Sequence, residues 1–378
     1  MIIGFDGKRA VSNATGLGNY SRLLIDQLSE HFPQHQYYIY SPKPDDQSRL
    51  ARLLERECVS LHLPQGSLLH RKMWRSLFGL SKQAQRDGVD ILHGLSAQLP
   101  LVPPAPSVKQ VVTVHDLIYC HFPHFYNPVD TAIYRFKCLQ ACKNADRVVA
   151  VSLCTKRDII NFLGIPEDKI SVIYQGCDSL FSQPVGQEAI DEVKKCYALP
   201  ARFLLNVGTI EERKNILLVV KALEHINDKD IPLVIVGRRT KYADMIDEYA
   251  QEHGLTGRII YLHQVHTRHL PALYHLTTCF VYPSRYEGFG IPIIEAQSCG
   301  APVIVATGSC LEEAAGTEAP AVNPDSVDEM VEALNSVLGD ESLRHSLIEH
   351  GRENVKRFEL AKLAGQMMAL YQEIKNLK

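Results

Sequence analysis

The chain has 378 residues, of which 46% are apolar and 22% charged, and its formal net charge is −3. This length favours two domains, the composition is that of a folded globular protein, and the charge balance gives no sign of nucleic-acid binding. The ten cysteines form no CxxC pairs and mostly stand in apolar segments, which is typical of buried thiols in a reducing cytoplasm. We also expect no signal peptide and no membrane-spanning helix.

The first half alternates short apolar runs with helical patterns. The runs are apolar throughout, as strands covered on both faces of a parallel sheet are. A glycine turn with Gly16 and Gly18 precedes the first helix and is suited to close approach of a phosphate. His115, at the end of the fourth run, is a candidate for proton relay. The expected strands are Met1–Phe5, Tyr37–Tyr40, Ile91–His93, Gln110–Val114 and Arg147–Val151, and the expected helices include Tyr20–Leu28 and Asp130–Lys143.

The segment Leu68–Arg86 allows two interpretations. Its basic residues together with Trp74 are typical of an amphipathic helix on an anionic membrane surface. An ordinary helix of the N-terminal domain that packs Trp74 and Leu77 inward fits the same pattern. Both interpretations stay open at this point.

The alternation pauses between Asp178 and Pro200, where we place a linker, and then restarts. Expected strands follow at Phe203–Val207, Leu233–Val236, Arg258–Tyr261, Cys279–Tyr282 and Pro302–Ala306, with a helix at Leu217–His225. Repeated strand–helix alternation predicts α/β domains with doubly wound parallel sheets. The tail Ser342–Lys378 is expected to be helical, with a break near Arg357–Glu359.

Two segments of the second half carry chemistry. The run from Tyr282 to Ala296 predicts a strand, a glycine loop and a helix that begins at Pro292, an arrangement suited to binding a diphosphate at a helix N-terminus. Glu287 in the loop and Glu295 in the helix are suited to accept hydrogen bonds from sugar and ribose hydroxyls. Arg213 and Lys214, at another strand-to-helix junction, are suited to hold the diphosphate.

These segments resemble the large family-4 glycosyltransferases. The resemblance is carried by the Glu-x7-Glu pair Glu287 and Glu295, by Cys299-Gly-Ala-Pro-Val303, and by the Gly-x4-Arg-Lys-Asn element from Gly208 to Asn215. It covers essentially the whole chain and departs from the family at Phe358-Glu-Leu and at Ser309–Gly316. It implies the GT-B fold, in which two Rossmann-like doubly wound domains face a central cleft. It also implies sugar transfer with retention at the anomeric carbon.

On this basis we divide the chain into residues 1–180 on the acceptor side, residues 181–355 for the nucleotide sugar, and residues 356–378 as a helix returning to the N-terminal domain. The resemblance gives Arg213 and Lys214 the donor diphosphate and places His115 beside the transferred sugar. The candidate catalytic residues are His115, Glu287, Arg213 and Lys214. The candidate donor-binding residues are Gly16, Gly18, Gly208, Gly237, Val265, Gly288, Phe289, Gly290 and Glu295.

The expected donor is GDP-mannose, with a UDP-sugar second, because the motifs resemble those of bacterial mannosyltransferases of surface-polysaccharide assembly. The expected acceptor is a glycan or a lipid-linked oligosaccharide, with the enzyme in the cytoplasm and in peripheral contact with the inner membrane surface as a further candidate. No metal or other cofactor is expected. Asp228-Lys-Asp230 matches a metal-binding Asp-x-Asp, but at the wrong end of its strand, and the histidines lack zinc spacing. A nucleotide-sugar 2-epimerase and a non-catalytic sugar-nucleotide-binding subunit are the alternative functions.

Overall fold

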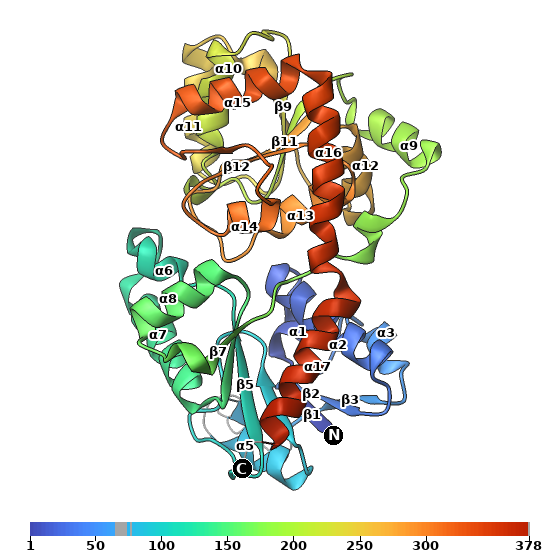
Figure 1. Ribbon diagram of the computed structural model, residues 1–378, viewed down its shortest axis with the longest axis vertical. Coiled ribbons are helices and arrows are strands. Elements are labelled where there is room, and N and C mark those ends of the chain that lie inside the picture. The colour runs from blue at the N-terminus through green and yellow to red at the C-terminus, as the bar shows by residue number, and fades with distance from the viewer. Residues whose placement is uncertain (65–73, 76–77, 377–378) are drawn as a thin grey trace. The chain divides into compact units, whose positions relative to one another are not determined.

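The computed structural model describes residues 1–64, 74–75 and 78–376, and the chain divides into two compact units. Unit 1 consists of residues 1–175 and 360–378, and unit 2 of residues 176–359. Each unit contains one parallel sheet with helices packed around it (Figure 1). The expected class, doubly wound α/β, is therefore confirmed.

The sheet of unit 1 has seven parallel strands in the order β3-β2-β1-β4-β5-β6-β7. The order reverses between β1 and β4, and ligands of open α/β sheets bind beyond the carboxyl ends of the strands at such a point. The strands are β1 Ile2–Asp6, β2 Gln36–Tyr40, β3 Val59–His62, β4 Ile91–Gly94, β5 Lys109–Val114, β6 Arg147–Ala150 and β7 Ile170–Val172. The α-helices are α1 Lys8–Ser12, α2 Gly16–His31, α3 Ala51–Leu54, α5 Gly79–Arg86, α6 Ile118–His121, α7 Pro128–Asn144, α8 Leu153–Leu163 and α17 Leu360–Asn376.

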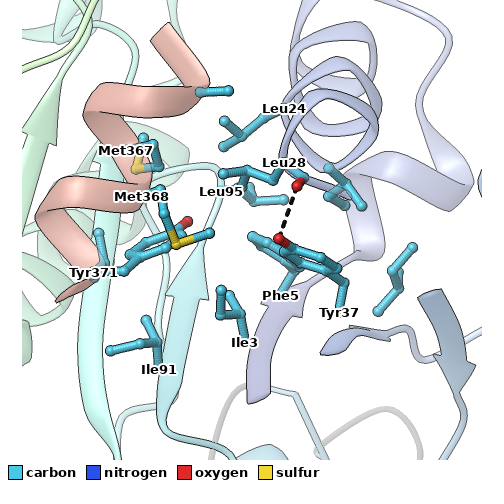
Figure 2. Packing of buried hydrophobic residues seen from close by; sticks show 14 of the residues in the cluster. Ile3, Phe5, Leu24, Leu28, Tyr37, Ile91, Leu95, Met367, Met368 and Tyr371 are labelled. Atoms are coloured by element: carbon cyan, nitrogen blue, oxygen red, sulfur yellow. Dashed lines mark hydrogen bonds between the residues drawn. The ribbon is translucent and has the colours of Figure 1, made fainter. Parts of the chain in front are cut away.

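The core of unit 1 joins the two ends of its sequence. Met367, Met368 and Tyr371 of α17 pack into the same buried cluster as Phe5 of β1 and Leu28 of α2 (Figure 2). The buried Tyr37 hydroxyl donates to the Leu28 carbonyl at 2.8 Å, so burying this phenol leaves no unpaired polar group. The expectation that the C-terminal helix returns to the N-terminal domain is confirmed by the contact of α17 with α2.

The sheet of unit 2 has six parallel strands in the order β10-β9-β8-β11-β12-β13, with its reversal between β8 and β11. Its strands are β8 Leu204–Val207, β9 Leu233–Val236, β10 Ile259–Leu262, β11 Cys279–Tyr282, β12 Val303–Ala306 and β13 Ala321–Val322. Its α-helices are α9 Gln187–Tyr197, α10 Ile216–His225, α11 Tyr242–Glu252, α12 Leu270–Leu276, α13 Ile291–Ser298, α14 Leu311–Ala315, α15 Val327–Gly339 and α16 Glu341–Val355. The expected break in the tail is present as the short 3-10 helix η7 Lys356–Phe358 between α16 and α17.

Two kinds of local prediction were wrong. The sequence patterns missed β3, β7 and β13, all of which lie at the edges of their sheets. An edge strand has only one neighbour, and in β3 only Val59 is buried, so the continuous apolar run that marks a central strand is absent. The first long helix was expected from Tyr20 but begins at Gly16, so Gly16 and Gly18 lie in its first turn and not in a loop before it.

Part of the segment Leu68–Arg86 lies outside the described residues, namely residues 68–73 and 76–77. Of the rest, Trp74 is buried against Tyr40 and Leu80, and Arg75 pairs with Asp6. These two side chains are therefore engaged within unit 1. Not one helix in the described parts of the chain combines the length and the apolar character that a membrane crossing requires.

Candidate functional site

The glycine loop of unit 2 connects β11 to α13. Gly290 is the N-cap of α13 with φ of 117°, a conformation that favours glycine, and a Cβ at this position would stand 3.0 Å from Ile293 Cδ1. The helix begins at Ile291, one residue before the expected Pro292, which lies in its first turn. The loop therefore delivers Gly288, Phe289 and Gly290 to the positive end of a helix dipole, where anions bind favourably.

Three charged side chains meet beside this loop. Arg213 and Lys214 belong to η4, the 3-10 helix Glu212–Lys214 that follows β8, and Glu287 lies in the loop after β11. Lys214 Nζ lies 2.5 Å and Arg213 Nη1 2.8 Å from Glu287 Oε1. The strands β8 and β11 are neighbours at the reversal of the sheet, so the fold itself brings the three together. We call Arg213, Lys214 and Glu287 the ion cluster.

The ion cluster is almost fully enclosed. Between 12% and 14% of each of the three side chains is exposed. Burial opposes ionisation of Glu287, but the charges of Lys214 and Arg213 outweigh it and lower the pKa of Glu287 to about 2. Burial likewise opposes the two positive charges, and the charge of Glu287 outweighs it and raises the pKa values of Lys214 and Arg213. All three groups are therefore ionised at neutral pH, with two cations sharing one carboxylate.

Further groups fix the cations in place. Lys214 Nζ also donates to the Tyr282 hydroxyl at 2.6 Å, and the Arg213 guanidinium donates to the Tyr286 carbonyl at 2.7 Å. Glu211, which is partly exposed, accepts a second bond from Arg213 at 2.6 Å. An arginine held at both ends and a lysine held at its tip are preorganised to meet an incoming anion.

Glu295 has a different environment from Glu287. It lies on α13, and its Oε2 accepts a hydrogen bond of 2.9 Å from the hydroxyl of Tyr274. Burial raises the pKa of Glu295 to about 7, although the Tyr274 hydrogen bond works in the opposite direction. The carboxyl group therefore changes its charge near neutral pH.

Gly208 and Gly237 follow β8 and β9 and touch each other through their backbones. A Cβ on Gly237 would stand 1.8 Å from the Gly208 carbonyl oxygen, so only glycine fits there. Gly208 has φ of 152° and lies beside the Lys214 side chain. A Cβ at Gly208 would stand 3.7 Å from Lys214 Cε. Val265 lies half-buried in the loop after β10. Gly208 thus borders the ion cluster, whereas Gly237 has a packing role of its own.

In unit 1, His115 follows β5 and is held from three sides. Its Nε2 donates to the Leu95 carbonyl at 2.9 Å, and the Gln175 side-chain amide lies 3.2 Å from its Nδ1. The edge of the imidazole meets the ring of Tyr20 at a centroid distance of 4.6 Å. Burial lowers the pKa of His115 to about 4, so the ring is neutral at physiological pH, with the proton on Nε2 and a lone pair on Nδ1.

The two glycines of α2 differ. A Cβ on Gly18 would stand 2.0 Å from the Asn13 carbonyl oxygen, so Gly18 is required for the packing of α2 on the preceding turn. A Cβ on Gly16 would meet nothing within 4 Å. His115, Gly16 and Gly18 belong to unit 1 and the ion cluster to unit 2, so their convergence in one cleft stays a prediction.

No sequence pattern indicated the role of Cys310. Its buried Sγ lies 3.0 Å from the Glu287 carbonyl oxygen and 2.9 Å from that of Phe289. The thiol therefore packs against both ends of the Glu287–Phe289 turn. The ring of Phe289 in turn meets Phe358 edge-on at 5.2 Å, at the position where the sequence departs from the usual aromatic-tryptophan pair. Tyr282 and Tyr274 were also missed as partners of the two glutamates.

The Asp-x-Asp triplet forms a surface turn. Asp228 Oδ1 accepts from the backbone N–H groups of Asp230 and Ile231 at 3.2 and 3.1 Å, and Arg202 pairs with the same carboxylate. Within residues 1–64, 74–75 and 78–376, no group of three or more His, Cys, Asp or Glu side chains is placed to hold a metal ion.

Comparison with known proteins gives a consistent result. Residues 192–354 match the family described as "Glycosyl transferases group 1", and residues 14–179 match "Glycosyltransferase Family 4". O-antigen chain mannosyltransferase B of Escherichia coli is 29% identical over 381 residues, which cover 94% of this chain and 96% of that protein.

Solved structures match over almost the whole chain. A glycosyltransferase from Rickettsia africae ESF-5 has a TM-score of 0.73 at 19% identity, covering 100% of this chain and 99% of its own. Anabaena Alr3699/HepE in complex with UDP and glucose has a TM-score of 0.75 at 17% identity, covering 99% of this chain and 100% of its own. At such identities the matches establish the fold alone, and the fold class expected from the sequence, GT-B, is confirmed.

Proposed function

Because this chain belongs to glycosyltransferase family 4, whose two sequence models match its two halves, we propose that it transfers a hexose from a nucleotide sugar to a glycan acceptor with retention at the anomeric carbon. The observation that carries the proposal is the ion cluster. Two buried cations stand next to the start of α13, at the carboxyl ends of two adjacent strands. This arrangement suits a diphosphate that gains negative charge as its bond to the sugar breaks.

The four candidate catalytic residues, two loop glycines and Glu295 have the following roles in this proposal. Arg213 and Lys214 bind the diphosphate, together with the loop at Gly288 and Gly290. Before the donor arrives, Glu287 pairs with both cations. Once the diphosphate has replaced it as their counter-ion, Glu287 accepts hydrogen bonds from the sugar hydroxyls. Glu295 accepts hydrogen bonds from the ribose. His115, neutral and fixed by its Leu95 bond, contacts the transferred sugar.

The reaction breaks the bond between the anomeric carbon and the phosphate oxygen and forms one between that carbon and the acceptor oxygen on the same face. The proton of the acceptor hydroxyl passes to the departing phosphate oxygen. Arg213 and Lys214 supply the positive charge that a divalent cation supplies in other glycosyltransferases, so we propose that turnover needs no metal. A glycosyl–enzyme adduct trapped on a carboxylate would exclude same-face attack, and a turnover rate abolished by EDTA and restored by a divalent cation would exclude metal independence.

The proposed donor is GDP-mannose, and the proposed acceptor is a lipid-linked surface glycan reached from the cytoplasmic side of the membrane. Support for mannose comes from the Escherichia coli relative, whose name is O-antigen chain mannosyltransferase B. A UDP-sugar is the second candidate, since the structurally similar Alr3699/HepE was crystallised with UDP and glucose. Thermal-shift measurements with GDP-mannose, UDP-glucose and ADP-glucose separate the donors, because a ligand that binds only the folded state raises the melting temperature.

The test of the site is a comparison of Lys214→Ala with the wild type. The charge that Lys214 meets grows in the transition state, so kcat should fall by about a hundredfold or more while the Kd of the donor changes much less. A change in donor affinity alone would refute the assignment. Incubation of the donor without acceptor addresses the alternative enzyme class, since a 2-epimerase would release an epimer.

A further inference from the structure

A second charged site lies in unit 1, at the carboxyl end of β1. Asp6, the last residue of β1, pairs with Arg75, whose Nε lies 2.6 and 2.8 Å from the two carboxylate oxygens. The Arg75 guanidinium also donates to the Gln98 side chain at 2.6 Å. Both members of the ion pair are nearly buried, with 6% and 11% of their side chains exposed. Asp6 and Arg75 therefore neutralise each other.

Three more cations surround this neutral pair. Lys8 and Arg9 follow β1 in α1, and Lys137 projects from α7. Burial lowers the pKa of the Lys8 ammonium group, and the positive charges of Arg75, Arg9 and Lys137 lower it further, so these groups are close together. Within the described residues, Lys8, Arg9 and Lys137 form no ion pair with a carboxylate, which leaves their positive charge uncompensated.

A pocket at the reversal of strand order has one of the three cations, Lys137, in its wall. Its lining consists of Asp6, Arg75, Gln98, Leu99, Leu101 and Lys137. Since β1 and β4 flank the reversal, this is the position where an open α/β sheet binds its ligand. The charge of Arg9 also contributes to the low pKa of His115, so the cations extend toward the proposed reaction site.

The helix that carries Lys137 has an unusual outer face. Val129, Ile133 and Phe136 follow one another at helical spacing, opposite the buried face formed by Cys138, Ala141 and Cys142. They are 67%, 46% and 53% exposed. Tyr134 on the same helix and Tyr126 just before it are 49% and 41% exposed. Single exposed apolar residues are normal, but five within eleven residues, three of them on one face of α7, indicate an apolar partner.

We propose that unit 1 binds the phosphate or diphosphate group of a lipid, with Lys8, Arg9 and Lys137 on the anion and the outer face of α7 against the lipid chains. Phosphate is the anion that matches three uncompensated cations around a neutral ion pair. Binding of a soluble phosphate would explain the cations but not the exposed apolar face of α7. Binding of a lipid phosphate explains both features. In a chain of net charge −3, such a local excess of positive charge would direct this surface toward an anionic bilayer.

The role of this lipid as the glycosyl acceptor rests on the proposed function, but its binding does not. The test therefore uses the full chain without donor and measures sedimentation with phosphatidylcholine vesicles, with and without phosphatidic acid. The wild type should bind only the vesicles that contain phosphatidic acid. Lys8→Ser with Lys137→Ser should weaken binding by about fivefold for each lysine. Val129→Ser with Phe136→Ser should also weaken it.

Matched controls stand on unit 2. Lys194→Ser with Lys195→Ser removes two exposed charges, and Met245→Ser removes an apolar side chain that is 52% exposed, so neither variant should change binding.

Equal binding of the Lys8–Lys137 double variant and the wild type would overturn the proposal. A soluble arm uses inorganic pyrophosphate, which should raise the melting temperature of the wild type more than that of the double variant, because the double variant keeps only the proposed diphosphate site at Arg213 and Lys214. Pyrophosphate binding without vesicle binding would overturn the lipid assignment. A chain that binds the vesicles but transfers no sugar would refute the proposed function alone.

Discussion

Replacing Glu287 by glutamine tests the balance of charge in the ion cluster. The substitution keeps the size of the side chain and removes the single negative charge that Arg213 and Lys214 share. The pKa of Glu287 falls from 4.5 to about 2 on folding, which corresponds to roughly 3 kcal/mol of stability at neutral pH. Only 13% of this side chain is exposed, so solvent screening reduces the figure little.

The sign of the effect follows from the direction of the shift. A carboxyl group whose pKa is lowered by folding stabilises the native state above its unfolded pKa of 4.5, and this contribution is lost as the pH falls toward 2. Glu287→Gln should therefore lower the melting temperature of unit 2 by roughly 6–12 °C at pH 7. The difference from the wild type should shrink on acidification. Calorimetry over a pH series measures both quantities.

Nucleotide binding gives the second readout. Without Glu287, a nucleoside diphosphate becomes the available counter-ion for two buried cations, so GDP or UDP should raise the melting temperature of Glu287→Gln more than that of the wild type. Turnover should nevertheless fall. Glu349→Gln removes an exposed partner of Arg352 in the same unit and should change stability by less than about 0.5 kcal/mol. Wild-type stability and an unchanged nucleotide response in Glu287→Gln would refute the reasoning.

Three further predictions concern neighbouring groups. Burial raises the pKa of Glu295 to about 7, so the stability that this carboxyl group contributes is lost as the pH rises from 4.5 to 7. At pH 8, calorimetry should therefore find Glu295→Gln more stable than the wild type, by at most roughly 3 kcal/mol. The same variant should bind the donor more weakly. His115 has a pKa of about 4, so the kcat/KM profiles of the wild type and His115→Gln should have the same shape above pH ~5 while the variant is slower. Cys310→Ser keeps a donor for the two loop carbonyls and should keep kcat, whereas Cys310→Val should lower it about tenfold in steady-state assays.

The sequence predicted the central strands because each is a continuous apolar run. It also predicted which residues follow those strands, since the motif Glu287–Gly290 and the pair Arg213–Lys214 both stand at strand ends. Periodicity does not predict strand order, however. The contact between these two segments depends on β8 lying next to β11. In the chain β9 and β10 lie between these two strands, whereas in the sheet β8 and β11 are neighbours. Only the motifs' joint resemblance to a family suggested it.

Glycine propensity explains the error at the start of α2. Gly16 and Gly18 each disfavour a helix by about 1 kcal/mol, so the local sequence indicates a turn. The structure places both in the first turn, where Gly18 permits contact with the Asn13 carbonyl that any Cβ would prevent. Tertiary packing overrides the local preference at this point. A side chain such as Cys310 could not be predicted at all, because a buried cysteine looks the same in sequence whether it fills space or bonds to a loop.

The two glutamates of the Glu-x7-Glu pair show why the chemistry of a motif needs its surroundings. Both carboxyl groups are buried, and burial alone raises the pKa of each. Glu287 has Lys214 and Arg213 at hydrogen-bond distance and stays ionised, whereas Glu295 accepts its hydrogen bond from the neutral Tyr274 hydroxyl and has a pKa of about 7. The fixed charge suits a residue that must balance two cations until a diphosphate replaces it. A carboxyl group that changes its charge near neutral pH, as Glu295 does, suits a residue that meets neutral hydroxyls. Each hydrogen bond that it accepts from a hydroxyl stabilises its ionised form and offsets the cost of burying the charge.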